Sequence, residues 1–261
     1  MTTVLPPAAA GDSGADGGVF PGSDPETTAV PASVTLRRPV DPSESPVLAE
    51  PAAGQEALDQ VGDRLVEVAA RNGMPPADLE DLLLSDDTAY LDRYGFVFFV
   101  DPAPDTAPRD GGDAAPAAAP FPYEDTFSLN SKPGSKRVVY LDFNGHTLPA
   151  SNGWRAGVYT ALAYDTDGAP GTFNDAEMDV IQSIWQRVAE DFAPFDVNVT
   201  TAAPAFDAIN RSSASDLTYG TRAVITNTAD TEICGFCGGV AYLGVFDIYD
   251  TFLPHSYYQP A

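Results

Sequence analysis

The pattern of apolar and polar positions is most regular between residues 136 and 201. Residues 137–143 form a short β-branched and aromatic run that ends at Asn144-Gly145, which predicts a strand that enters a turn. Apolar side chains then recur at steps of three and four residues from Met178 to Phe192, as they do along one buried face of a helix. Residues 196–201 alternate polar with apolar positions, which predicts a half-buried strand.

Both ends of this helix carry recognisable signals. Asn174 stands three residues before Glu177, so the two side chains can form a capping box with the first free backbone amides. Pro194 is expected to end the helix. A strand, a helix and a strand in direct succession need a sheet on which to pack, so this region predicts the core of an α/β or α+β domain.

A second periodic region precedes this core. Leu58, Val61, Leu65 and Val68 fall on one helical face, and Asn72-Gly73 supplies a stop signal. Pro75-Pro76 can open a second, shorter helix. Residues 89–91 and 96–100 then predict two strands joined by a turn. This region is therefore expected to be a small helix-helix-hairpin segment whose apolar hairpin leans on the larger domain.

Composition divides the chain into four parts. Residues 1–54 are rich in Ala, Pro, Gly, Ser, Thr and Asp, which predicts a disordered leader. The helix-helix-hairpin segment spans residues 55–101, and residues 102–135 form a linker and lead-in. Residues 136–261 form the main domain, in which residues 222–226 and 240–246 predict further strands on either side of a glycine-rich loop at 234–239.

The charge of the chain excludes several classes of partner. Thirteen basic side chains stand against 38 acidic ones, which gives a formal charge of −25. Nucleic acids and anionic membranes require clustered Lys and Arg, so we expect neither as a partner. No apolar run approaches the roughly 18 residues that span a bilayer. The first residues lack the basic and apolar regions of a signal peptide, so the protein either stays inside the cell or has a signal that this sequence does not include.

The two cysteines, Cys234 and Cys237, have the C-x-x-C spacing of a redox dithiol, half a zinc site or a local disulfide. Two glycines and a strand follow them, whereas a redox dithiol precedes a helix whose N-terminus lowers the thiol pKa. No second cysteine pair exists to complete a structural zinc site. A disulfide that closes the loop is therefore favoured, and it would indicate an oxidising compartment.

No complete catalytic site is visible in the residues alone. His146 and His255 have no paired helical spacing, and an H-E-x-x-H zinc motif is absent. Residues 165–168 resemble the start of a calcium loop, but Ala169 and Ala176 occupy its fifth and twelfth positions, so a turn before the helix is expected instead. Serine-nucleophile and phosphate-loop motifs are absent as well.

Four stretches nevertheless resemble one known family. Residues 139–147, 164–168, 184–199 and 237–244 are similar to secreted bacterial zinc metallopeptidases of the metzincin type, and the Trp-Gln-Arg-Val-Ala-Glu-Asp segment at 185–191 is the most specific part. The resemblance covers about residues 136–261. It implies an α+β fold, the metzincin-type upper subdomain, with a mixed twisted sheet and one long helix. The helix-helix-hairpin segment would then be part of a pro-region.

The resemblance also implies a site. The last predicted strand would be the edge along which an extended protein or peptide substrate lies, with Gly239, Val240, Ala241 and Tyr242 as its substrate-binding residues. Gly238 and Gly239 would allow a close approach of the substrate backbone. In the family, zinc is held by a helix that bears H-E-x-x-H-x-x-G-x-x-H.

That helix is expected beyond Ala261. We therefore expect zinc only in a full-length form, and no catalytic residue, metal ligand or peptidase activity in the chain as given. A sheet without this helix would leave one face bare, which predicts exposed apolar surface. Two alternatives remain open, a non-catalytic acidic secreted binding or structural module and a C-x-x-C thiol oxidoreductase.

Overall fold

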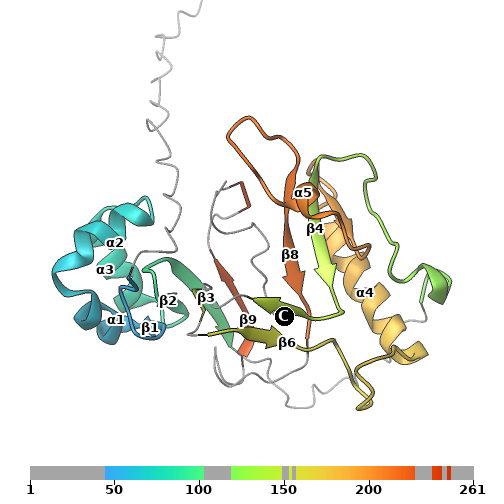
Figure 1. Cartoon of the computed structure of the whole chain (residues 1–261), viewed down its shortest axis with the longest axis horizontal. Coiled ribbons are helices and arrows are strands. Elements are labelled where there is room, and N and C mark those ends of the chain that lie inside the picture. Colours follow the sequence, from blue (N-terminus) through green and yellow to red (C-terminus); the bar gives the residue numbers. More distant parts are fainter. Residues whose placement is uncertain are drawn as a thin grey trace, which may run out of the picture. The chain divides into compact units, whose positions relative to one another are not determined.

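The computed structural model describes residues 45–102, 119–148, 153–154, 157–226, 237–242 and 246–247. These residues contain helices and the strands of three separate sheets, so the predicted α+β class is confirmed as a mixed fold of helices and sheets (Figure 1). No helix in the described ranges is long and apolar enough to cross a membrane.

The first part of the fold consists of three short helices and a hairpin. Helix α1 (Gly54–Val61) is followed by a 3-10 turn, η1 (Gly62–Arg64), and by α2 (Leu65–Arg71). The predicted single helix is thus divided, because Gly62 takes a positive φ of 51° that ends α1. Helix α3 (Pro76–Ser85) begins at the predicted proline pair, and strands β2 (Ala89–Leu91) and β3 (Val97–Pro102) form the predicted hairpin.

This segment has a hydrophobic core of its own. Residues 45–53, which their composition places in the leader, already belong to it, because Leu48 and Ala52 are buried and β1 (Ala52–Ala53) pairs with β2. The buried members of this first core come from the residues before β1, from strands β1 to β3 and from helices α1 to α3: Leu48, Ala52, Ala57, Val61, Val68, Ala69, Leu79, Leu83, Ala89, Leu91 and Val97.

A second, parallel sheet carries the long helix. Strand β4 (Arg137–Asp142) lies between β7 (Asn198–Thr200) and β8 (Tyr219–Val224), and both pairings are parallel. Helix α4 (Asp175–Asp191) precedes β7, as the sequence predicts, and lies alongside β4 in Figure 1. The predicted direct succession from β4 to the helix is wrong, because two further strands intervene. A two-stranded hairpin of β5 (His146–Leu148) and β6 (Tyr159–Ala161) precedes the helix.

The predicted capping box of α4 is present. The Asn174 side chain accepts a hydrogen bond of 3.0 Å from the Glu177 amide, and the Glu177 carboxylate accepts one of 2.9 Å from the Asn174 amide. Trp185 anchors the buried face of the helix through a 3.0 Å hydrogen bond from its indole N–H to the Val199 carbonyl. The buried apolar residues between this face and the sheet are Leu129, Val139, Leu141, Phe143, Ile181, Trp185, Val197, Val199 and Ile225.

The opposite face of the parallel sheet is also covered at its central strand. Val138 and Tyr140 pack with Ile209 of the short helix α5 (Phe206–Ile209), and all three side chains are buried. The guanidinium of Arg222 lies over the Tyr140 ring at 5.3 Å. The prediction of a bare face is therefore wrong at β4, because α5 and Arg222 cover the side chains of Val138 and Tyr140.

The residues before β4 are tied to the second sheet and to α4. The Phe121 amide donates a hydrogen bond of 2.9 Å to Gln182 on α4, next to the 3-10 turn η2 (Tyr123–Asp125). Asn130 forms an isolated bridge with Thr200 of β7. The part of the predicted linker and lead-in from residue 119 onward thus pairs its backbone groups with the domain.

Candidate peptide-binding edge

The predicted substrate-binding residues lie together on strand β9 (Cys237–Tyr242), and β3 of the small segment is paired with them. The two strands are antiparallel, so that Phe98 is opposite Tyr242 and Val100 is opposite Val240. The register shifts after Asp101, which is opposite Gly239. Strand β9 is the last strand of the order β1-β2-β3-β9 among the described residues. The resemblance implies that a substrate lies along β9, and in the structure the chain's own β3 occupies one edge of that strand (Figure 1).

The side chains of β3 divide between two cores. Val97 is buried in the first core of the small segment, and Phe99 packs against the same core. Phe98 and Val100 point the other way, into a second core shared with the β5–β6 hairpin and β9. This alternation is that of a strand with both faces covered. Strand β3 therefore closes the small segment with one face and contacts the main domain with the other.

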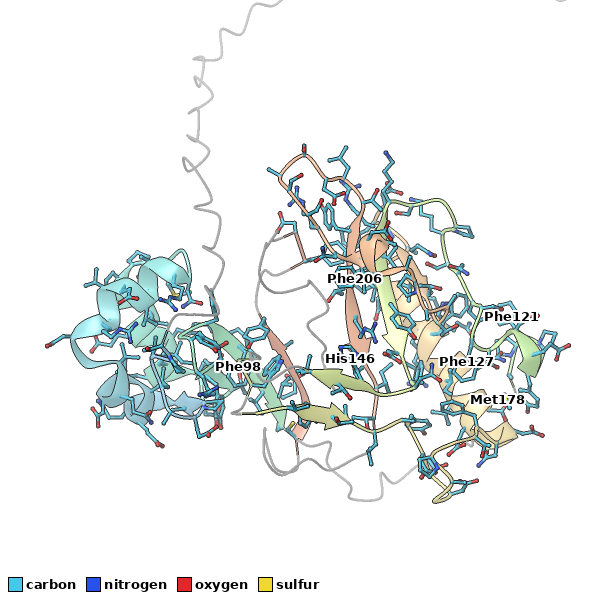
Figure 2. The ribbon with its side chains drawn as sticks, viewed as in Figure 1. Phe98, Phe121, Phe127, His146, Met178 and Phe206 are labelled. Atoms are coloured by element: carbon cyan, nitrogen blue, oxygen red, sulfur yellow. The ribbon has the colours of Figure 1, made fainter. Side chains whose placement is uncertain are left out.

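Phe98 is the centre of this second contact (Figure 2). Its side chain is fully buried, and its ring lies 5.0 Å from that of Trp154 in an edge-to-face arrangement. The rings of Tyr242 and Tyr90 are 6.0 and 5.5 Å away. Aromatic pairs at such distances add about 0.5–1.5 kcal/mol to the burial of their area. The buried residues of this second core are Phe98, Leu148, Trp154, Tyr159, Ala161, Val224, Val240 and Tyr242.

A buried carboxylate closes one end of the contact. Asp92, in the turn between β2 and β3, accepts hydrogen bonds from the amides of Tyr94 (2.9 Å) and Phe96 (2.8 Å) and from the hydroxyl of Tyr242 (2.8 Å). Burial raises the pKa of Asp92 to about 6, although these hydrogen bonds and the nearby Arg71 act to lower it. Tyr242 thus joins the tip of the hairpin to the end of β9.

Gly153 makes this arrangement possible. Its carbonyl accepts a 3.2 Å hydrogen bond from the Arg93 amide. A Cβ atom at this position would collide with the Asp92 carboxylate and the Tyr242 hydroxyl, so only glycine allows the backbone to approach so closely. Three segments far apart in the sequence, at residues 92–93, 153 and 242, therefore meet at one buried point.

A second polar cluster lies on the parallel sheet around His146. Arg222 donates a hydrogen bond of 2.6 Å to Asp142, and its same nitrogen, Nη1, lies 3.0 Å from Nδ1 of His146. Burial and the Arg222 charge lower the pKa of His146, so the imidazole is neutral at pH 7 and its Nδ1 accepts from the guanidinium. His146 is thus placed as a hydrogen-bond acceptor in β5, and His255 lies outside the described residues.

Three carboxylates, those of Asp165, Asp167 and Glu177, have oxygens within 4.8 Å of one another. Each is already hydrogen-bonded. Glu177 accepts from the amide of Thr166 at 2.6 Å, Asp165 from that of Gly168 at 2.9 Å, and Asp167 from the Asn174 side chain at 2.8 Å. These bonds build the turn that enters α4, as expected from the sequence.

The described residues do not fit a catalytic zinc ion. Catalytic zinc sites combine histidines with a carboxylate or cysteine, whereas the one group of metal-ligand type found in the described ranges is made of carboxylates alone. Oxygen-only groups suit calcium or magnesium better than zinc.

Cys237 opens strand β9 and is disulfide-bonded. Cys234, the other cysteine of the chain, lies outside the described residues, so their pairing stays a prediction. A strand, and not a helix N-terminus, follows Cys237. The helix N-terminus that lowers the thiol pKa in redox dithiols is thus absent from the described residues directly after Cys237.

Sequence reasoning missed Asp92, Phe98 and Trp154 as parts of this edge. One signal was present for Phe98, because residues 96–100 are apolar at every position and do not alternate. An unbroken apolar run is typical of a strand buried on both faces. Asp92 and Trp154 carry no such local signal.

Comparison of the chain with protein-family models, with curated proteins and with solved structures finds no match.

Proposed function

We propose that the chain is the substrate-holding part of a secreted zinc-dependent endopeptidase of the metzincin type, and that β9 is the strand along which an extended protein or peptide substrate lies. One observation carries the proposal. Strand β9 accepts an extended segment, β3, in antiparallel register through Phe98, Phe99, Val100 and Asp101. A strand that accepts one extended segment offers the same backbone donors and acceptors to another.

The arrangement of the parallel sheet supports the same proposal. Along the chain, β4, the long helix α4, β7, β8 and β9 follow one another as a strand, a long helix, two strands and an edge strand, which is the order that the resemblance implies. The β5–β6 hairpin is inserted before α4, and β9 pairs with β3 in a sheet separate from β7-β4-β8. Zinc and the bond-breaking step are assigned to residues other than the described ones, which do not fit the metal. The small segment occupies one edge of β9, as a pro-region that covers a substrate site would.

Two measurements test the proposal. Isothermal calorimetry of the 261-residue chain with zinc, and a casein assay with and without chelator, are expected to show neither stoichiometric tight binding nor cleavage. The reading frame that continues after codon 261 is expected to encode H-E-x-x-H-x-x-G-x-x-H. A frame that lacks this motif would overturn the peptidase proposal, and chelator-sensitive cleavage by the chain itself would overturn the assignment of zinc to other residues.

A second candidate is a non-catalytic acidic binding module. It is favoured by the carboxylate-only composition of the one group of metal-ligand type among the described residues. In this candidate β9 is still the strand that binds a peptide, but the protein does not cleave peptide bonds. The two are separated by the downstream motif. A thiol oxidoreductase gains no support from the position of Cys237 at the start of a strand.

A further inference from the structure

The small segment can separate from β9 without opening its own core. All buried members of the first core lie between Leu48 and Val97, and none belongs to β9 or the β5–β6 hairpin. The boundary between the two cores runs along β3, between neighbouring residues Val97 and Phe98. Departure of the segment would therefore expose one face of β3 with Tyr90 and Phe96, break the Tyr242–Asp92 hydrogen bond, and empty the Phe98 site on the main domain. The buried residues of the first core would stay packed.

The site that Phe98 would leave is lined by residues of the main domain. Trp154 and Tyr242 flank the ring, and they also contact each other, with centroids 4.3 Å apart. Leu148, Val224 and Val240 complete the buried apolar surroundings. These groups come from β5, β8 and β9 and from the segment before β6, so the main domain supplies all the buried residues around Phe98. Tyr90 and Phe96 of the small segment complete the surroundings as partly buried side chains.

We infer that this pocket is a side-chain subsite of the β9 edge, and that it selects extended peptides with an aromatic residue in the register of Phe98. The inference rests on the proposed role of β9 in peptide binding. The backbone of such a peptide would take the place of β3 and pair antiparallel with β9. Its aromatic ring would then meet the faces and edges of Trp154 and Tyr242 that Phe98 meets now.

The register also specifies a second position. Val100 is opposite Val240 and points into the same core as Phe98, because alternate residues of a strand share a face. A peptide bound in place of β3 would thus place an apolar side chain two residues after the aromatic one. The residue between them would face the side that the first core now covers. The selected pattern is aromatic, any residue, then apolar.

The test uses the full chain and a fluorescein-labelled peptide that copies residues 95–102, Gly-Phe-Val-Phe-Phe-Val-Asp-Pro. A second peptide has Ala in place of the residue equivalent to Phe98. The protein variant Phe98→Ala empties the pocket and weakens the hold of β3 on β9. Phe99→Ala is the matched control, since it removes the same ring from the next residue, which packs against the first core.

The copied peptide is expected to bind the Phe98→Ala chain at least about tenfold more tightly than the native chain, as large aromatic anchors do in pockets. The Phe99→Ala chain is expected to bind it as weakly as the native chain does. The Ala-containing peptide is expected to lose at least about tenfold in affinity for the Phe98→Ala chain. Anisotropy titration measures each dissociation constant.

Each other result overturns the inference in a distinguishable way. Equal binding of both peptides to the Phe98→Ala chain would leave strand pairing at β9 intact and exclude the aromatic subsite. If neither peptide binds, both strand pairing at β9 and the aromatic subsite are excluded. This result does not depend on what the downstream reading frame encodes. A dimeric Phe98→Ala chain in size-exclusion chromatography would assign the edge to a second copy of β3. If Phe98→Ala shows no cooperative thermal unfolding, Phe98→Val replaces it, with the same criteria, because it also removes the ring from the pocket and keeps an apolar β-branched side chain in the strand.

Discussion

The hydroxyl of Tyr242 donates a hydrogen bond of 2.8 Å to the carboxylate of Asp92, a residue that precedes it by 150 positions. Asp92 holds the tip of the β2–β3 hairpin, because its other oxygen accepts from the amides of Tyr94 and Phe96. Tyr242 is the last residue of β9. The bond therefore links the geometry of the hairpin turn to the end of the candidate peptide-binding strand.

Tyr242→Phe removes this bond and keeps the ring. We expect the free energy of unfolding in urea to fall by about 1.5–3 kcal/mol, the range for hydrogen bonds to charged groups. Tyr123→Phe is the control, since Tyr123 donates to Asp179 at 3.0 Å from a partly exposed position. Its loss is expected to be below about 1 kcal/mol. Equal losses in the two variants would show that the buried hydrogen bond to Asp92 stabilises the protein no more than the partly exposed bond to Asp179 does.

The raised pKa of Asp92 predicts a pH dependence. Its folded-state pKa of about 6 lies above the ordinary value of 3.8, so the folded protein binds the proton more tightly than the unfolded chain does. The stability from this group is therefore complete below pH 3.8 and is lost as pH rises through 6. Between pH 5 and pH 7 the loss is about 1 kcal/mol.

Urea unfolding at pH 5, 6 and 7 measures this loss in the native chain and in Asp92→Asn. The groups that face the carboxylate are the Tyr242 hydroxyl, the two turn amides and, at longer range, the Arg71 guanidinium. Asparagine cannot release a proton, so the difference between the two proteins isolates the titration of Asp92. A difference that stays constant over this range would contradict the raised pKa.

The elements that were predicted correctly are those specified by nearby residues. The capping box of α4 needs only Asn174 and Glu177, and the buried face of the helix needs only its own periodicity. Strands β2, β3, β4 and β7 were found for the same reason. Predicted and observed ends differ by a few residues, as at β7, where pairing with β4 covers only 198–200.

The pairing of β3 with β9 could not be predicted, because a run such as residues 96–100 indicates a strand and does not identify its neighbour. The partners are more than a hundred residues apart, and their contact depends on Trp154, Gly153 and Asp92 meeting between them. The resemblance placed a substrate edge at residues 239–242, but it gave no sign that the chain's own hairpin lies there. Long-range pairing is a property of the assembled core and not of either segment.

Asn174→Ala tests the cap of α4. The substitution removes the acceptor for the Glu177 amide and the donor to the exposed Asp167 carboxylate. It is expected to lower the free energy of unfolding by about 1 kcal/mol, chiefly through the lost cap. Asp175→Ala, at the first helical position, is the control, because no side-chain cap bond is assigned to it. Thermal unfolding followed by circular dichroism compares the two. A loss for Asn174→Ala no larger than that for Asp175→Ala would contradict a specific contribution of the Asn174 cap bond.

Asp142 and Arg222 form the buried pair of the parallel sheet, with the Asp142 side chain 2% exposed and that of Arg222 21%. Asp142→Ala leaves the mostly buried guanidinium of Arg222 without its anionic partner and beside a neutral His146. The Nε atom of Arg222 is already buried and has no hydrogen-bond partner among the described residues. We expect a loss of about 3 kcal/mol in the free energy of unfolding, as when one partner of a buried ion pair is removed. The exposed pair of Lys132 and Asp196 is the control, since Lys132→Met is expected to cost less than about 1 kcal/mol.

Adding Arg222→Met to Asp142→Ala should recover part of the loss, because the uncompensated charge is then gone. If the double variant is less stable than Asp142→Ala alone, Arg222 contributes chiefly through its contact with the Tyr140 ring and not through the ion pair.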